Sequence, residues 1–200
     1  MRAEALPEAK SEFIALVDFE YASNMRERAV QIQALEESAT KYMVLNGRYS
    51  IDAIRRIYRK TSIYFLASRE SFGLPICELQ ACGSYVFTPD THWCPSHWLK
   101  TDLAQEGPGE LSPNFIVYHN DKDRLIREIQ RIKTAYDPKT VVETFRRYHP
   151  QLFQGNEGEL REFIQKVRTG VIHSSSHKDY VDIRGLGYFP SFSPDAPHSG

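Results

Sequence analysis

The stretch Ser68-Arg69-Glu70-Ser71-Phe72-Gly73-Leu74-Pro75-Ile76-Cys77-Glu78 decides the predicted fold. An apolar run, residues 63–67, leads into it, and a short helical segment, residues 75–82, leads out. Gly83 ends that segment, and a second apolar run follows at 85–87. The order predicts a strand, a tight loop, a helix and a second strand.

Three features of this loop suit a phosphorylated ligand. Gly73 has no Cβ, so the backbone can approach a ligand closely. Pro75 fits the first turn of a helix, where a missing N–H is not needed. The free N–H groups at the start of the helix, together with the helix dipole, favour an anion.

Two carboxylates bracket the loop. Glu70 lies at the carboxyl end of the predicted strand, where open α/β sheets bind ligands. Glu78 lies one turn into the helix, within reach of a ribose hydroxyl. Each acid alone also has a structural interpretation, because Glu78 can offset the helix dipole and Glu70 can be an ordinary polar loop residue. The joined string is more specific than either acid.

The run from Glu70 to Glu78 resembles the E-x7-E signature of retaining GT-B glycosyltransferases, especially the family 4 type. That signature reads E-x-F-G-L-P-x-x-E, then a small-residue helix ending A-x-G, then a strand. The present chain continues with Ala81-Cys82-Gly83 and the run 85–88. Outside the signature the resemblance is weak and extends over about residues 42–165. It covers only the carboxyl-terminal, donor-binding half of such an enzyme.

The resemblance implies transfer of a sugar from a nucleotide-sugar to an acceptor hydroxyl, with retention. Glu70 is then the catalytic candidate. It would orient sugar hydroxyls and stabilise an oxocarbenium-like transition state rather than act as a covalent nucleophile. No cofactor or metal ion is expected, since the nucleotide-sugar is a substrate. The residues expected to bind the donor are Ser71, Phe72, Gly73, Leu74 and Glu78 around the phosphate, sugar and ribose, and Gly47, Arg48 and Tyr49 near the base.

The sequence departs from the family where the leaving diphosphate must be neutralised. The usual Gly-Arg and Lys-Gly dyad after the first strand is missing. Either the chain begins one strand late, or Arg26 or Arg28 replaces the dyad. The simpler interpretation of both arginines is an exposed helix face. Only Arg69 separates Ser68 from Glu70, one residue fewer than usual, which makes Arg69 another phosphate-binding candidate.

The loop 89–98 contains aromatic residues and several metal-ligand types. Zinc bound by His92, Cys94 and His97 is disfavoured, because structural zinc usually has four ligands in regular pairs. Such a loop more often shapes a ligand pocket. By the resemblance this region faces the cleft, so His92 or Trp93 would contact the sugar or the acceptor. The alternative, that the tryptophans only cover the sheet, is equally good.

Composition limits the class of protein. The chain has 25 basic and 26 acidic residues and a net charge of −1, which argues against a general nucleic-acid binder. No apolar run approaches the ~20 residues that span a bilayer, and the start lacks the apolar centre of a signal peptide. Three cysteines without metal-site spacing favour a reducing compartment. We therefore expect a cytoplasmic protein, peripheral at the membrane if the basic residues of helix 51–60 bind anionic lipid, although a solvated helix face explains them better.

Strands alternating with helices predict an α/β fold: a Rossmann-like parallel sheet flanked by helices, one half of a GT-B fold. The expected strands are the runs 13–17, 42–45, 63–67, 85–88 and 114–118. We expect a frayed start at 1–12, a nucleotide-sugar-binding domain at 13–169, and a poorly ordered tail at 170–200 with Tyr188, Phe189 and Phe192 as a docking spot.

Three hypotheses about function remain open at this level. The chain is a glycosyltransferase donor domain that works with an acceptor-binding half on another segment or chain. Or it is a binding module for a nucleotide or nucleotide-sugar, without turnover. Or it is an interaction domain whose carboxylates are structural. The acceptor would be a glycan, a lipid-linked sugar or a protein.

Overall fold

A computed structural model describes residues 10–66, 70, 72–91, 93–99, 110–155 and 157–169. Its contacts divide the chain into two units, residues 1–155 and 156–200. The first unit contains all the strands that are described and helices α1 to α6, and the second contains α7 (Glu157–Arg168). The predicted domain 13–169 therefore spans both units, while the predicted tail 170–200 and the start at 1–9 lie outside the described residues.

The first unit is built on one sheet of five parallel strands. They are β1 (Ile14–Val17), β2 (Lys41–Val44), β3 (Ile63–Phe65), β4 (Tyr85–Thr88) and β5 (Phe115–Val117). Each of the five predicted apolar runs contains or overlaps one of these strands. The α/β fold with a parallel, Rossmann-like sheet is thereby confirmed.

The strand order is β2-β1-β3-β4-β5. Val17 of β1 pairs with Val44 of β2 on one side and with Phe65 of β3 on the other. The chain thus leaves β1 toward β2 and then crosses back over β1 to reach β3. In open α/β sheets the reversal of strand order opens a crevice at the carboxyl ends of the two strands concerned. Here those strands are β1 and β3.

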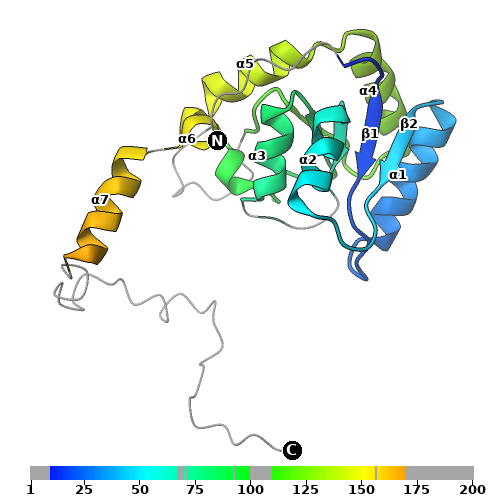
Figure 1. Ribbon diagram of the computed structural model, residues 1–200. Coiled ribbons are helices and arrows are strands. Elements are labelled where there is room, and N and C mark those ends of the chain that lie inside the picture. Colours follow the sequence, from blue (N-terminus) through cyan, green and yellow to red (C-terminus); the bar gives the residue numbers. More distant parts are fainter. Residues whose placement is uncertain are drawn as a thin grey trace, which may run out of the picture. The chain divides into compact units, whose positions relative to one another are not determined.

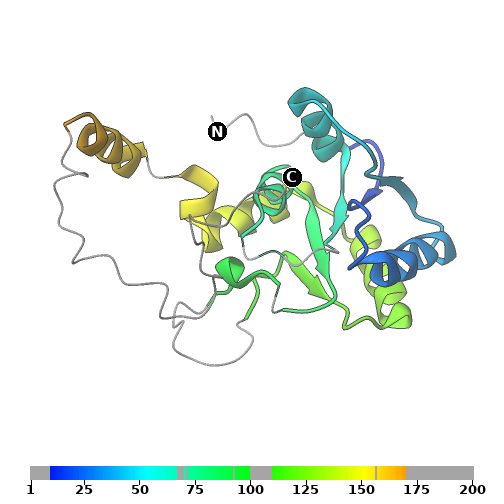
Figure 2. The same ribbon diagram turned by 90° about the horizontal axis from the view of Figure 1, so that it is seen from below.

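Helices cover both faces of the sheet (Figures 1 and 2). One face carries α1 (Met25–Glu37) and α4 (Lys122–Thr134), and the other carries α2 (Ile51–Lys60) and α3 (Leu74–Ala81). The remaining helices of the unit are α5 (Pro138–Tyr148) and α6 (Pro150–Gln154), with a 3-10 turn, η1 (Pro95–His97), after β4.

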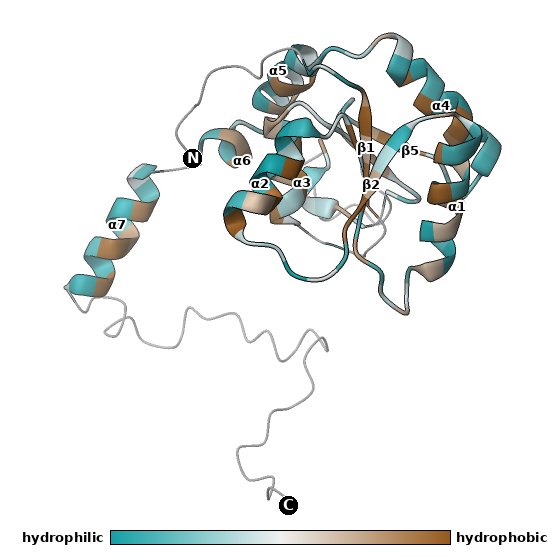
Figure 3. Cartoon of the chain, turned by 45° about the vertical axis from the view of Figure 1, so that its right-hand side comes forward, coloured by the Kyte–Doolittle hydropathy of each residue, from teal (hydrophilic) through white to brown (hydrophobic). Residues whose placement is uncertain are grey.

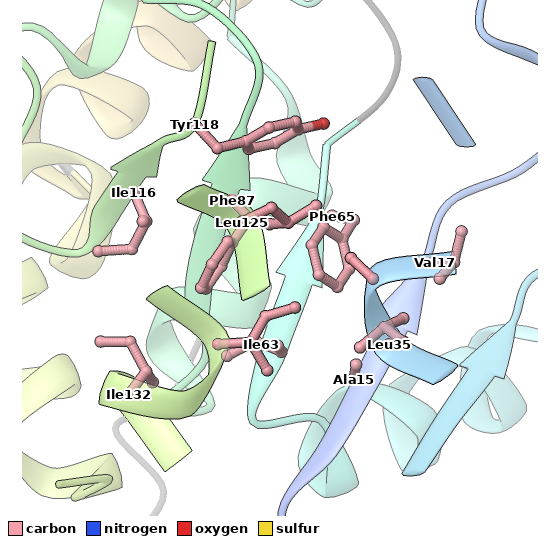
Figure 4. Close-up of a cluster of buried hydrophobic side chains, with 12 residues drawn as sticks. Ala15, Val17, Leu35, Ile63, Phe65, Phe87, Ile116, Tyr118, Leu125 and Ile132 are labelled. Atoms are coloured by element: carbon pink, nitrogen blue, oxygen red, sulfur yellow. The ribbon is translucent and has the colours of Figure 1, made fainter. Parts of the chain in front are cut away.

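Buried apolar side chains form a separate core on each face of the sheet. Beneath α1 and α4, residues such as Phe65, Phe87 and Leu125 are fully buried (Figure 4). Beneath α2 and α3, the core also includes the phenols Tyr58 and Tyr64. Alternating strand residues supply the two cores, as expected for a sheet that is covered on both sides.

Side chains cap several of the helix starts. Ser50 accepts a hydrogen bond from Ala53 N at 3.2 Å, and Asp121 accepts one from Arg124 N at 2.9 Å. Asn24 precedes α1 but does not cap it, because its amide bridges the loop between Tyr21 N and Phe19 O instead. Pro138 occupies the first turn of α5, where its ring is tolerated.

Candidate functional site

The described part of the predicted loop, Glu70 and residues 72–78, follows β3 in the chain, and β3 pairs with β1. Glu70 follows β3, and Asp18 follows β1 directly, so two carboxylates end two paired strands at the same sheet edge. The neighbours Ser71 and Arg69, which were expected to bind the donor and its phosphates, lie outside the described residues. The fold therefore brings Glu70 to the position where this sheet topology accepts ligands.

Gly73 forms the turn between β3 and α3. Its φ of +67° is in the left-handed region, which L side chains rarely adopt. An added Cβ would overlap Glu70 Oε2 and lie 2.8 Å from Ile76 Cδ1. The Glu70 carboxylate thus lies directly over the α-carbon of Gly73. Glycine is required here for both its conformation and its small size.

The backbone around Gly73 has hydrogen-bond donors to spare. Among the described residues, the N–H groups of Phe72, Gly73 and Leu74 find no acceptor. The Phe72 and Leu74 side chains are 40% and 68% exposed, so this turn is at the surface. These donors stand at the start of α3, where the helix dipole is positive. The turn suits an anionic group.

Glu70 is half-buried and carries an unsatisfied atom. Its Oε2 is shielded from solvent and makes no hydrogen bond within the described part of the chain. Burial raises the pKa of Glu70, and the nearby negative charge of Asp18 raises it further. A buried carboxyl oxygen without a donor is costly, so a ligand hydroxyl at this position would stabilise the site.

Tyr58 of α2 shows that three carboxylates share one neighbourhood. Its side chain is buried, and burial raises the pKa of its phenol. The charges of Glu78, Asp18 and Glu70, in that order, raise the pKa further. Glu78 lies on α3 and is half-buried. The negative charges of Glu78, Asp18 and Glu70 therefore all act on the Tyr58 phenol.

Asp18 is a candidate residue that sequence reasoning missed. Only 6% of it is exposed, and burial raises its pKa despite hydrogen bonds from Phe19 N, at 2.8 Å, and from the Tyr64 phenol. The only signal in the sequence was its position after an apolar run. That β1 pairs with β3, and so places Asp18 beside Glu70, depends on the strand order.

The two arginines proposed for phosphate binding lie on α1. Arg28 is engaged: its Nη1 pairs with Glu20 Oε2 at 2.5 Å, and its Nε donates to the Asp18 carbonyl at 3.2 Å. Its side chain is 13% exposed. Arg26 is exposed in the first turn of the helix. The Arg28 guanidinium is therefore already engaged.

The turn expected near the base lies across β1 from Glu70. Gly47 has a φ of +70° and, like Arg48, is exposed after β2. The Tyr49 ring packs against Phe19 with centroids 6.1 Å apart, which joins this turn to the loop that carries Asp18. Gly47, Arg48 and Tyr49 thus line the same sheet edge as the carboxylates.

The loop after β4 approaches the Gly73 turn through His97. The buried His97 Nε2 lies 2.9 Å from the Phe72 carbonyl oxygen. Trp93 is half-buried and packs against the core beneath α2 and α3, whereas His92 lies outside the described residues. No cluster of three or more metal-ligating side chains occurs among the residues that the structure describes.

The comparisons with known proteins add no family to this geometry. No protein-family model matches the chain, and no curated protein matches its sequence significantly. Within the described ranges, no helix combines the length and apolar character needed to cross a membrane.

Proposed function

We propose that the chain is the donor-binding domain of a glycosyltransferase and binds a nucleotide-sugar at the carboxyl edge of β1 and β3. The observation that carries the proposal is the Gly73 turn. It combines a left-handed glycine, three N–H groups without acceptors among the described residues, and the Glu70 carboxylate directly above. These groups suit a diphosphate next to a sugar.

The proposed roles follow from what each group offers. The N–H groups of the turn bind the distal phosphate, and Glu78 accepts hydrogen bonds from ribose hydroxyls. Glu70 has a buried oxygen without a donor, which a sugar hydroxyl would satisfy. Its negative charge next to the sugar ring would also stabilise an oxocarbenium-like transition state. The transfer proceeds with retention, to a glycan, a lipid-linked sugar or a protein.

Exposed apolar residues around this edge support a partner domain. The first residues of three successive helices are large, apolar and exposed: Met25 at 57%, Ile51 at 68% and Leu74 at 68%. Tyr21 and Phe72, in the preceding loops, are 52% and 40% exposed. Apolar residues that gather around a polar site indicate an interaction surface. We infer that an acceptor-binding half, on another segment or chain, covers this edge.

Calorimetry with UDP, GDP and ADP tests donor binding. We expect one of them to bind wild-type protein, and Glu78→Gln to weaken that binding about tenfold by removing a charged acceptor. The matched control is Glu37→Gln on α1, which removes an exposed carboxylate far from the turn in the fold and should leave the affinity unchanged. Failure of all three nucleotides to bind would contradict the proposal.

Turnover separates transfer from binding. With the matching nucleotide-sugar, the chain together with its acceptor half should release nucleoside diphosphate, and Glu70→Gln should lower that rate by more than about 100-fold. Nucleotide binding that persists in Glu70→Gln while turnover is lost assigns Glu70 to catalysis. Equal turnover by both proteins would contradict that role.

A second function, a nucleotide-binding module without turnover, is favoured by the charges at the site. The negative charges of three carboxylates act on Tyr58, and Arg28, which donates to the Asp18 carbonyl, is paired with Glu20. A departing diphosphate needs a positive charge, and these carboxylates oppose it. Binding of a nucleoside diphosphate without turnover, even with the acceptor half supplied, would favour this alternative.

A further inference from the structure

His97 is buried against the Gly73 turn and holds one of its peptide groups. Its Nε2 lies 2.9 Å from the Phe72 carbonyl oxygen, and because a carbonyl only accepts, Nε2 must carry the proton. The rings of Phe72 and His97 also stack, with centroids 6.4 Å apart and an angle of 27° between their planes. His97 is fully buried, and its Nδ1 has no partner among the described residues.

This bond sets the direction of the Gly73 N–H. The Phe72 carbonyl and the Gly73 N–H belong to one planar trans peptide group, in which they point in opposite directions. Holding the carbonyl toward the buried His97 therefore turns the N–H away from the protein interior. That N–H is one of the three donors without an acceptor in the described part of the turn.

A second histidine holds the first. His149 lies at the junction of α5 and α6. The two rings meet edge to face with centroids 5.4 Å apart, and only 2% of His149 is exposed. The ring of His149 also packs near Phe145 of α5, with centroids 6.2 Å apart. The His97 ring is thereby in contact with both Phe72 and His149.

We propose that His97 is the positioning residue of the candidate site: its Nε2–H holds the Phe72 carbonyl and so presents the Gly73 N–H to an anionic ligand. His149 supports this arrangement by packing its ring against that of His97. The role in ligand binding rests on the proposed function, whereas the role in the geometry of the turn does not.

The geometry is tested without any ligand by nuclear magnetic resonance on the full chain. In wild-type protein at neutral pH, long-range nitrogen–proton correlations should show His97 neutral and protonated at Nε2. Observation of the Nδ1-protonated tautomer would overturn the proposal, and this measurement needs no variant.

Variants then separate the hydrogen bond from the packing. His97→Gln keeps an N–H donor near the Nε2 position, and His97→Leu removes it. We expect the Gly73 amide resonance to shift in His97→Leu but not in His97→Gln, because only the leucine variant loses the bond that orients this peptide group. The matched control is Cys77→Ala, since Cys77 Sγ lies 4.0 Å from His97 Nε2 but leaves the Phe72 bond intact. An unchanged Gly73 amide in a folded His97→Leu would contradict the proposal.

Affinity for UDP, or for whichever nucleoside diphosphate binds wild-type protein, tests the ligand role. We expect about a tenfold loss in His97→Leu, recovery to within about threefold in His97→Gln, and no change in Cys77→Ala. Equal losses in the leucine and glutamine variants would overturn the ligand role. If no nucleotide binds wild-type protein, the proposed function fails while the resonance measurements still decide the positioning role.

Discussion

The two faces of the sheet are packed with different kinds of side chain. Beneath α1 and α4 the core is almost entirely apolar, and Gln31 reaches the Tyr118 phenol at 2.9 Å as a buried polar pair. Beneath α2 and α3 the buried set contains Tyr58, Tyr64 and His97, with Asp18 at its edge. Figure 4 shows the first of these cores, where the hydroxyl of Tyr118 is drawn in red beside apolar side chains such as Phe65 and Phe87.

The difference indicates what each face contributes. Buried apolar groups stabilise a fold without conditions, whereas buried polar groups stabilise it only when each has a partner. On the α2/α3 side, Glu70 Oε2, His97 Nδ1 and His149 Nε2 are buried without hydrogen-bond partners among the described residues. On the α1/α4 side, Gln31 Oε1 is buried in the same way. We infer that the α1/α4 face mainly stabilises the unit, and that the α2/α3 face gives up some stability to form a site.

The largest expected change in stability is on the α1/α4 face. Leu125→Ala removes a fully buried side chain of α4 and should lower the free energy of unfolding by about 3 kcal/mol, from lost burial and a residual cavity. Urea denaturation measures this change. Nucleotide affinity of the folded variant should be unchanged, and a loss of affinity comparable to that of Glu78→Gln would contradict the separation of the two faces.

Gly73→Ala, on the α2/α3 face, should cause a smaller loss of stability than Leu125→Ala. The left-handed φ strains alanine, and its Cβ would displace Glu70, so we expect a loss of about 2 kcal/mol and of nucleotide binding. Gly47→Ala is the control, because Gly47 has a φ of +70° and nothing within 4 Å of the added Cβ. It should lose only about 1 kcal/mol, the cost of the left-handed conformation alone. Equal losses in both variants would argue that Glu70 does not lie over Gly73.

Acidic pH should lower the free energy of unfolding through His97, on the α2/α3 face. Burial lowers the pKa of His97 from about 6.5 to about 4, and the hydrogen bond to the Phe72 carbonyl partly offsets this shift. The other titratable groups next to the His97 ring are Cys77 and His149. The unfolded chain then binds a proton more readily, so stability present above pH ~6.5 falls as the pH drops toward 4, by at most about 1.4 kcal/mol per pH unit. Burial lowers the pKa of His149 in the same direction.

The raised pKa values of Asp18 and Glu70 act in the opposite sense, because they add stability below their unfolded values that is lost as the pH rises. The comparison of wild type with His97→Gln removes this background, which both proteins share. Urea denaturation between pH 7 and 4 should show the stability of the two proteins converging or crossing in acid. Parallel pH profiles would contradict a buried, neutral His97.

The smallest expected change in stability comes from an ion pair on the outer surface of α1 and α4. Lys122 Nζ pairs with Glu37 Oε1 at 2.6 Å between α4 and α1, and both side chains are partly exposed. Glu37→Gln should lower the free energy of unfolding by less than about 0.5 kcal/mol, because exposed ion pairs are screened by solvent. A loss above 1 kcal/mol, measured by urea denaturation at low salt, would give this pair a structural role.

The helix of the second unit differs from both faces. The apolar residues of α7, Leu160, Phe163, Ile164 and Val167, are all at least 40% exposed, and Figure 3 shows apolar and polar residues alternating along this helix. Its ion pairs, Arg161 with Glu157 and Lys166 with Glu162, are internal to the helix.

The sequence by itself determined the kinds of element and the loop at Gly73. Apolar runs depend on near neighbours along the chain, so they identified the five strands that the structure describes. The positive φ of Gly73 likewise follows from local backbone geometry.

Only the tertiary structure decided the strand order and the partners of the loop. The crossing of α2 over β1 places β1 beside β3, and this pairing brings Asp18 to Glu70. The packing of the loop after β4 against α5 and α6 brings His97 and His149 to Phe72. These contacts join residues far apart in the chain, and they form because both faces of the sheet must be covered at once, a condition that no local pattern contains.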